Sequence, residues 1–160
     1  MKNIARRALP GLMALGLILA ASAAWAFEGT VQRVADGDTI TVEGVHVRLF
    51  GIDAPELAQL DGREARDYLS HLALGKRVDV REKDIDAYGR TVAVVLLPDG
   101  SELNSEMVRA GHAWVYRNYC RPCYGLRLAE TAARLRGLGL WADPAPVPPW
   151  QWRKHHRRNK

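Results

Sequence analysis

TVQRVADGDTITVEGVHVRLF, residues 30–50, alternates apolar and polar side chains over short segments that are separated by two turn signals. Alternation with a period of two is typical of a strand with one buried face. Asp36-Gly37 and Glu43-Gly44 stand at the interruptions, where tight turns between strands are expected. We therefore predict three consecutive strands over residues 30–34, 39–42 and 45–50.

The period changes to that of a helix between residues 62 and 74. Ala65, Leu69 and Leu72 fall at i, i+4 and i+7 and form an apolar stripe on one face, and Gly75 stands where such a helix would end. A single amphipathic helix is therefore predicted after the third strand.

Two further strands and two further helices are predicted beyond this helix. The strands cover residues 77–81 and 91–97, with a charged loop over 82–90 between them. A short helix capped by Asn104 follows, and then a third helix over residues 126–136. Five short strands with one helix between the third and fourth fit an α+β, mainly β fold, a five-stranded Greek-key barrel of the OB type. The pattern alone also fits other α+β folds.

The two ends of the chain differ in composition from the middle. Residues 1–26 combine three basic residues, an apolar run and the small-residue sequence Ala24-Trp25-Ala26, which predicts a cleaved signal peptide, with a retained anchor as the alternative. Residues 27–143 form the predicted domain, and 144–160 a Pro-rich strap and a basic C-terminal tail. The prolines predict an extended, non-helical strap. We expect an exported monomer that is periplasmic or secreted and has no stable membrane association after cleavage.

Net charge does not by itself indicate a nucleic-acid partner. The chain has 23 Lys and Arg against 18 Asp and Glu, a formal net charge of +5. Three of the basic residues lie in the predicted signal and five lie in residues 153–160. The tail could therefore contact a phosphate backbone, or it could be a solvated, disordered end.

Cys120 and Cys123 are the two cysteines of the chain, in Cys-x-x-Cys spacing. In an exported protein such a pair is usually oxidised to a local disulfide, with free thiols or metal or redox chemistry as alternatives. A zinc site would need two more ligands, and His112 is the only histidine nearby. A loop this short would add little stability.

Charged side chains gather at the ends of the predicted strands. Asp38 opens the second strand and Asp53 follows the third, and a hairpin brings these ends together. Two carboxylates at one strand edge repel each other unless a cation lies between them, and they offer the oxygen ligands that calcium prefers. Glu56 could hold a water near that cation, and Arg48 suits a two-pronged contact with phosphate. With Arg90 as a second positive group, these residues provide what phosphodiester hydrolysis requires.

The order and spacing of these motifs resemble the staphylococcal nuclease (thermonuclease) family. The matching segments are Val34-Ala35-Asp36-Gly37-Asp38-Thr39-Ile40, Arg48-Leu49, Gly51-Ile52-Asp53-Ala54-Pro55-Glu56, Asp86-Ala87-Tyr88-Gly89-Arg90, Leu103-Asn104, Gly111-His112-Ala113 and Gly139-Leu140-Trp141. The resemblance implies a five-stranded OB barrel with about three helices. It also implies a calcium-dependent nuclease that hydrolyses phosphodiester bonds of DNA or RNA and leaves 3′-phosphate ends.

The resemblance further implies a role for each residue of the site. Asp38, Asp53 and the backbone carbonyl of Ala54 would hold Ca²⁺, although Ala54 stands where the family's first-described member has a threonine, so a hydroxyl contact is lost. Glu56 would be the general base for the attacking water. The remaining implied residues are Arg48 and Arg90 as phosphate-binding groups that stabilise the transition state, and Asp36 as a carboxylate that orients the metal site.

Aromatic side chains are the implied substrate-binding groups. Tyr88 matches its motif, whereas Tyr116 and Tyr119 match only approximately, because residues 117–125 carry the cysteine pair and differ from the family pattern. Trp114 and Tyr116 also fit a packed core.

Two other classes of protein fit the sequence less well. One is a non-catalytic OB module that binds nucleic acid or a protein, and the other is an envelope redox or metal-carrying protein that uses Cys120 and Cys123.

Overall fold

Five strands close into a barrel in the computed structural model, which describes residues 26–157. The strand order around the barrel is β1-β2-β3-β6-β5. The strands are β1 Ala26–Val34, β2 Thr39–Val42, β3 Val45–Leu49, β5 Arg77–Ile85 and β6 Thr91–Leu96. β3 and β6 pair in parallel and the other neighbours are antiparallel. The predicted five-stranded barrel is confirmed.

A second, two-stranded sheet stands at the mouth of the barrel. It pairs β4, Ile52–Asp53, with β7, Trp114–Val115, so that Asp53 lies opposite Trp114. This sheet was not predicted from the sequence, because two-residue strands have no detectable period.

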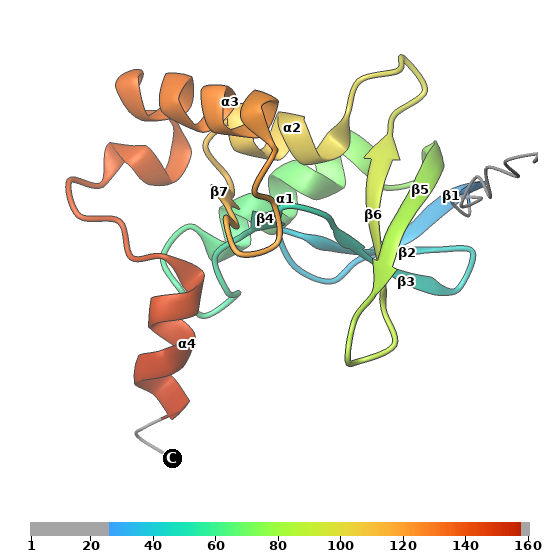
Figure 1. Ribbon diagram of the computed structural model, residues 1–160, viewed down its shortest axis with the longest axis horizontal. Coiled ribbons are helices and arrows are strands. Elements are labelled where there is room, and N and C mark those ends of the chain that lie inside the picture. Colours follow the sequence, from blue (N-terminus) through green and yellow to red (C-terminus); the bar gives the residue numbers. More distant parts are fainter. Residues whose placement is uncertain (1–25, 158–160) are drawn as a thin grey trace, which may run out of the picture.

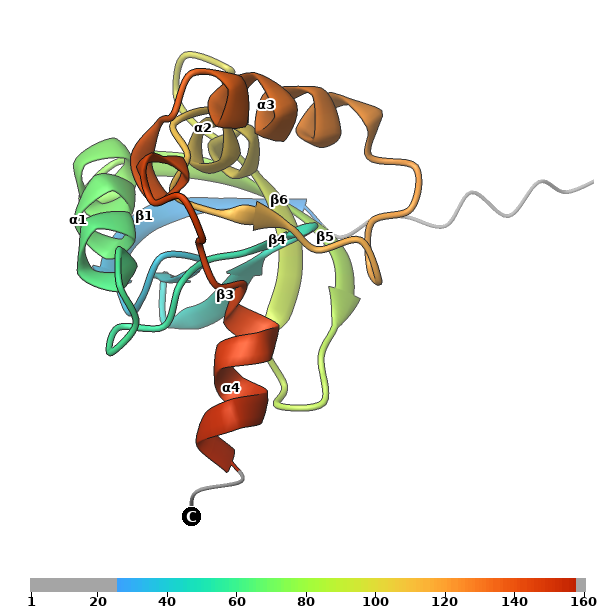
Figure 2. The same ribbon diagram turned by 90° about the vertical axis from the view of Figure 1, so that its left-hand side faces the viewer.

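The helices are α1 Gly62–Ala73, α2 Leu103–Arg109, α3 Tyr124–Leu135, the 3₁₀ helix η1 Gly139–Ala142 and α4 Pro149–Arg157. Figure 1 shows α1, α2 and α3 gathered on one side of the barrel, whereas α4 extends away from them. In Figure 2, turned by 90°, α4 descends from the region of β3 and β4. No helix within residues 26–157 has both the length and the apolar character needed to cross a bilayer.

Three predicted elements have different bounds from those expected. β1 begins at Ala26, four residues before the predicted start, because residues 26–30 pair with β5. β5 continues to Ile85, into the segment predicted as a charged loop, because antiparallel pairing with β6 extends to Ile85 and Thr91. The basic tail is helical from Arg153 through Arg157, so the disordered alternative does not hold for these residues. Only residues 143–148 connect η1 to α4 without helix, and Pro149 starts α4, where the absent N–H group costs nothing.

Asn104 was predicted to cap α2, and this prediction is wrong. α2 begins at Leu103, and its N-cap residue, Glu102, makes no side-chain cap hydrogen bond. Asn104 is fully buried, its amide oxygen accepts from the N–H of Val95, and its amide nitrogen donates to the carbonyls of Phe50 and Ala93. It therefore ties α2 to the barrel.

The predicted disulfide between Cys120 and Cys123 is present, with the two Cα atoms 5.4 Å apart. Cys120 is fully buried and packs against Gly51, which precedes β4. Gly51 has a φ of +79°, and an added Cβ there would lie 2.7 Å from the sulfur of Cys120. Glycine is therefore required at this turn both for its conformation and for space.

The predicted signal segment lies, apart from Ala26, outside the described residues, so its cleavage stays a prediction. Ala26 belongs to β1, where it pairs with Arg81.

Candidate active site

Asp38 stands at the start of β2 and is almost completely buried. Its Oδ1 accepts hydrogen bonds from Thr39 at 3.0 Å and from Nη1 of Arg48 at 2.6 Å, and its Oδ2 accepts from the N–H of Ala54 at 3.0 Å. The N–H of Asp38 donates to Asp36 at 3.0 Å. Burial, together with the charge of Asp36, raises the pKa of Asp38 to about 6, although Arg48 opposes this shift.

Arg48 bridges the two carboxylates that the sequence analysis singled out. Its partner across the antiparallel β2–β3 pair is Thr39, so its side chain lies beside that of Asp38. Its Nη2 donates to Oδ1 of Asp53 at 2.9 Å, and Asp53 is fully buried. Although burial lowers the pKa of Arg48, the charges of Asp38 and Asp53 raise it overall.

Arg153 of α4 completes this cluster, and the sequence analysis did not find it. Its Nη1 donates to Glu56 at 2.7 Å and to Oδ1 of Asp53 at 3.2 Å, and its Nη2 donates to Oδ2 of Asp53 at 2.8 Å. Burial lowers the pKa of Arg153, but its hydrogen bonds to the two carboxylates raise it overall. Asp53 thus lies between two guanidinium groups.

Arg90 lies close to the site along the sheet but binds a different carboxylate. It immediately precedes β6, whose Thr91 pairs with Val47 of β3, so it is near Arg48 in the register. Its Nε donates to Asp86 at 2.7 Å. Burial raises the pKa of Asp86, but hydrogen bonds from Arg90 and Tyr88 lower it overall. The Arg90 guanidinium is therefore held by Asp86 in the loop that connects β5 to β6, and not by Asp38 or Asp53.

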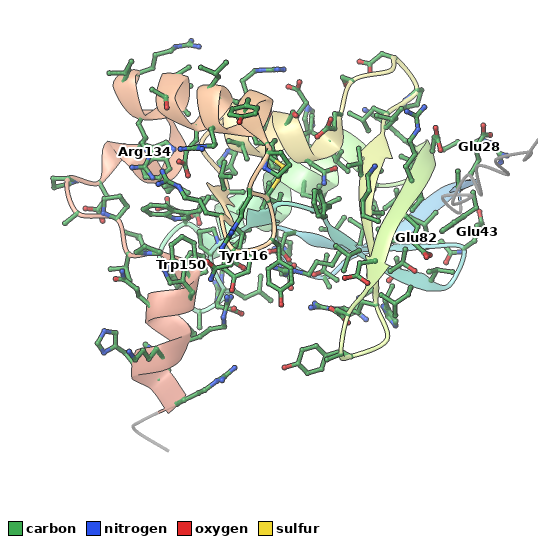
Figure 3. The ribbon with its side chains drawn as sticks, in the orientation of Figure 1. Glu28, Glu43, Glu82, Tyr116, Arg134 and Trp150 are labelled. Carbon is green, nitrogen blue, oxygen red and sulfur yellow. A yellow bond between two sulfur atoms is a disulfide. The ribbon has the colours of Figure 1, made fainter. Side chains whose placement is uncertain are left out.

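Of the three predicted substrate-binding tyrosines, Tyr116 and Tyr119 stack on each other, and Tyr88 stands on the β5–β6 hairpin. Tyr88 is 81% exposed on the β5–β6 hairpin, with Arg90 over its ring at 5.5 Å. Tyr116 and Tyr119 stack at 5.2 Å, and Trp150 of α4 lies 5.7 Å from Tyr116. Figure 3 shows Tyr116 and Trp150 as neighbours left of the centre of the view, whereas the acidic residues Glu28, Glu43 and Glu82 lie on the right.

Trp114 belongs to the packed interior. It is buried, and its ring contacts Trp141 at 4.3 Å and Trp150 at 5.7 Å, with the guanidinium of Arg134 4.9 Å from its centre. Of the two interpretations of Trp114, the structure supports core packing.

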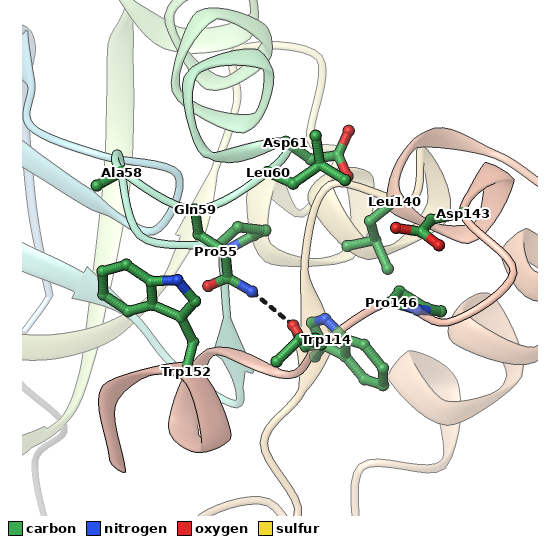
Figure 4. A pocket seen from close by; sticks show the side chains of 11 residues that line it. Pro55, Ala58, Gln59, Leu60, Asp61, Trp114, Leu140, Asp143, Pro146 and Trp152 are labelled. Carbon is green, nitrogen blue, oxygen red and sulfur yellow. Dashed lines mark hydrogen bonds between the residues drawn. The ribbon is translucent and has the colours of Figure 1, made fainter. Parts of the chain in front are cut away.

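A cavity of about 230 Å³ lies between the loop after β4 and the segment that precedes α4. Figure 4 shows Trp114 and Trp152 among its lining residues, with Pro55 and Leu60 from the loop. The side-chain amide of Gln59 donates to the carbonyl of Val147 at 2.5 Å, which fastens the two segments together next to Glu56.

Known proteins resemble this chain over most of its length. Residues 46–143 match the model of the family described as "Staphylococcal nuclease homologue". The chain belongs to the staphylococcal nuclease family. A protein of Shigella flexneri named "Micrococcal nuclease" is 40% identical, over 92% of this chain and 92% of that protein. An "Uncharacterized endonuclease" of Escherichia coli O157:H7 is 46% identical over 81% and 86%, and "Protein ParB" of Escherichia coli is 40% identical over 100% and 98%.

The carboxylates fit the cation that this nuclease family implies, although they do not enclose it. Within residues 26–157, no group of three or more His, Cys, Asp or Glu side chains is arranged to hold an ion by itself. Asp38, Asp53 and Glu56 nevertheless bring two guanidinium groups to one barrel edge, which shows that this edge requires positive charge. A calcium ion there would need the Ala54 carbonyl and water or phosphate oxygens to reach its usual six to eight ligands.

Proposed function

We propose that this nuclease-family chain is a calcium-dependent enzyme that hydrolyses phosphodiester bonds of DNA or RNA and leaves 3′-phosphate ends. The observation that carries the proposal is the buried pair Asp38 and Asp53, bridged by Arg48 at the mouth of the barrel. Burying two carboxylates next to each other is costly unless positive charge compensates them, so their retention at a barrel mouth suits a cation-dependent reaction.

Each residue of the cluster has a distinct part in the proposed reaction. Asp38, Asp53 and the Ala54 carbonyl would hold Ca²⁺, which when bound supplies positive charge to the attacked phosphate. Glu56, half-exposed beside them, accepts the proton of the attacking water at a carboxylate oxygen. Asp36 keeps the turn before Asp38 in place through the N–H of Asp38.

The arginines and aromatic residues contact the substrate in this proposal. Arg48 is rigidly held by two carboxylates and presents a planar donor group for the phosphate oxygens. Arg90 approaches from the hairpin once a phosphate competes with Asp86 for its guanidinium. Tyr88 and Tyr119 expose ring faces on which unpaired bases can stack, with Tyr116 behind Tyr119. The predicted signal makes export to the periplasm or the medium part of the proposal.

The test is digestion of single-stranded DNA and of RNA by the purified protein, produced with its N-terminal segment so that processing follows its natural course. Cleavage is expected with calcium and should stop with a chelator and in Asp38→Ala. The products should be extended by a polymerase only after phosphatase treatment. Folded protein that binds nucleic acid but does not cleave it with calcium would favour the non-catalytic OB module.

A further inference from the structure

The guanidinium of Arg153 occupies the open side of the carboxylate cluster. It forms a two-pronged contact with Asp53 and shares Nη1 with Glu56, at 2.7–3.2 Å. Arg48 also donates to Oδ1 of Asp53, and Asp53 has no exposed surface. Both oxygens of Asp53 and Oε1 of Glu56 are thus already bound to a cationic group.

Charge balance and shared acceptor oxygens favour competition between Arg153 and a divalent cation. When ionised, Asp38, Asp53 and Glu56 together with Arg48 carry two net negative charges, which is the charge that one Ca²⁺ neutralises. Arg153 neutralises one of these charges and uses Oδ2 of Asp53 and Oε1 of Glu56 as acceptors. A cation bound to the same oxygens would lie in direct repulsion with the guanidinium.

Packing of α4 holds Arg153 in this position. Pro149 is buried, and the ring of Trp150 lies between those of Trp114 and Tyr116, 5.7 Å from each. After Arg153 the helix is exposed, from Lys154 to Arg157. Arg153 is therefore the last anchored residue of α4, and the connection from η1, which has no helix, is tied to the loop after β4 by the hydrogen bond from Gln59 to Val147.

We propose that α4 is a built-in competitor for the cation: Arg153 occupies the carboxylates of Asp53 and Glu56 in the resting protein and must withdraw before Ca²⁺ binds there. This inference rests on the proposed function, because it assumes that calcium binds at these carboxylates. The site is then open only in the fraction of molecules in which Arg153 has left it, and the apparent calcium affinity is lowered by that fraction.

Calcium titration by calorimetry tests the competition without measuring activity. Arg153→Ala should bind calcium about tenfold more tightly than the wild-type protein, if the site is open in about one molecule in ten. Lys154→Ala is the matched control, since it removes the same charge from the next residue of α4 and should leave the affinity within about twofold of wild type. Trp150→Ala releases α4 without changing the charge and should also tighten binding.

Hydrogen exchange of the wild-type protein provides the second measurement. Amide protection in residues 149–157 should fall when calcium is added, while that of β2 and β3 should not. Equal calcium affinity in wild type and Arg153→Ala, weaker affinity in Arg153→Ala, or unchanged protection of α4 would overturn the competitor role and leave the proposed function standing. A complete lack of calcium binding in all variants would overturn both.

Discussion

The carboxylate cluster and helix α4 meet at one point but are built in different ways. Asp38, Arg48 and Asp53 lie within 15 positions of one another in the sequence and are fixed by a hairpin, a turn and a buried two-stranded sheet. Arg153 reaches Asp53 from 100 positions away, and the packing of Pro149 and Trp150 and its own ion pairs with Asp53 and Glu56 hold it there. A site can therefore combine a part encoded by local pattern with a part encoded by distant contacts.

The largest expected difference between the two regions concerns their arginines. Arg48→Lys should lower kcat about 10²-fold, because one ammonium group cannot bridge Asp38 and Asp53 and still present a planar donor to phosphate. The matched change Arg153→Lys should not lower kcat. Steady-state kinetics at saturating calcium measures both, and equal losses would mean that the two arginines share one role.

Substitutions of Asn104 and Trp150 compare how much the barrel and α4 each contribute to the free energy of unfolding. Asn104→Ala should reduce the free energy of unfolding by about 2–3 kcal/mol, because it leaves the buried N–H of Val95 and carbonyl of Phe50 without partners. Trp150→Ala should cost only about 1 kcal/mol, since its ring is half-buried at the edge of the domain. Urea unfolding gives both values. A larger loss for Trp150→Ala would make α4 part of the cooperative fold.

The smallest expected effect is a dependence of the free energy of unfolding on pH, caused by His112 after α2. His112 packs on Tyr68 at 4.5 Å, its Nδ1 is buried without a hydrogen-bond partner, and burial lowers its pKa below 6.5. The unfolded chain therefore takes up a proton as the pH falls below 6.5, before the folded protein does. The stability contribution of His112 is complete above that pH and is lost as the pH falls through the lowered pKa of the folded state.

His112→Phe keeps the ring contact with Tyr68 and removes the titrating group. Unfolding by urea at about pH 7.5 and about pH 5.5 should show a smaller loss of stability in the variant than in the wild-type protein. An identical loss of stability in both proteins would mean that groups other than His112, such as those of α4, cause the pH dependence.

Most of the barrel followed from the sequence, because strand alternation and turn signals are local properties. The predicted strands at residues 39–42 and 45–50 agree with β2 and β3, and the predicted helix over 62–74 agrees with α1. The cap assigned to Asn104 was wrong because its amide has better partners in the barrel, which no local pattern reveals. The disordered alternative for the basic tail was wrong over residues 153–157, because these residues continue α4.

By itself, the sequence determined most strands and helices, the cysteine pair as a candidate disulfide, and the carboxylates and arginines of the site, since these depend on short-range spacing and residue chemistry. The order and spacing of its motifs then selected the barrel, through the resemblance to a known family. Only the tertiary structure decided that Asp53 is fully buried between two guanidinium groups and that Arg153 of α4 is one of them. The physical reason is distance along the chain. A contact between residues 100 positions apart depends on how every intervening element packs. The sequence around a single arginine in a basic tail does not indicate which carboxylate it will bind.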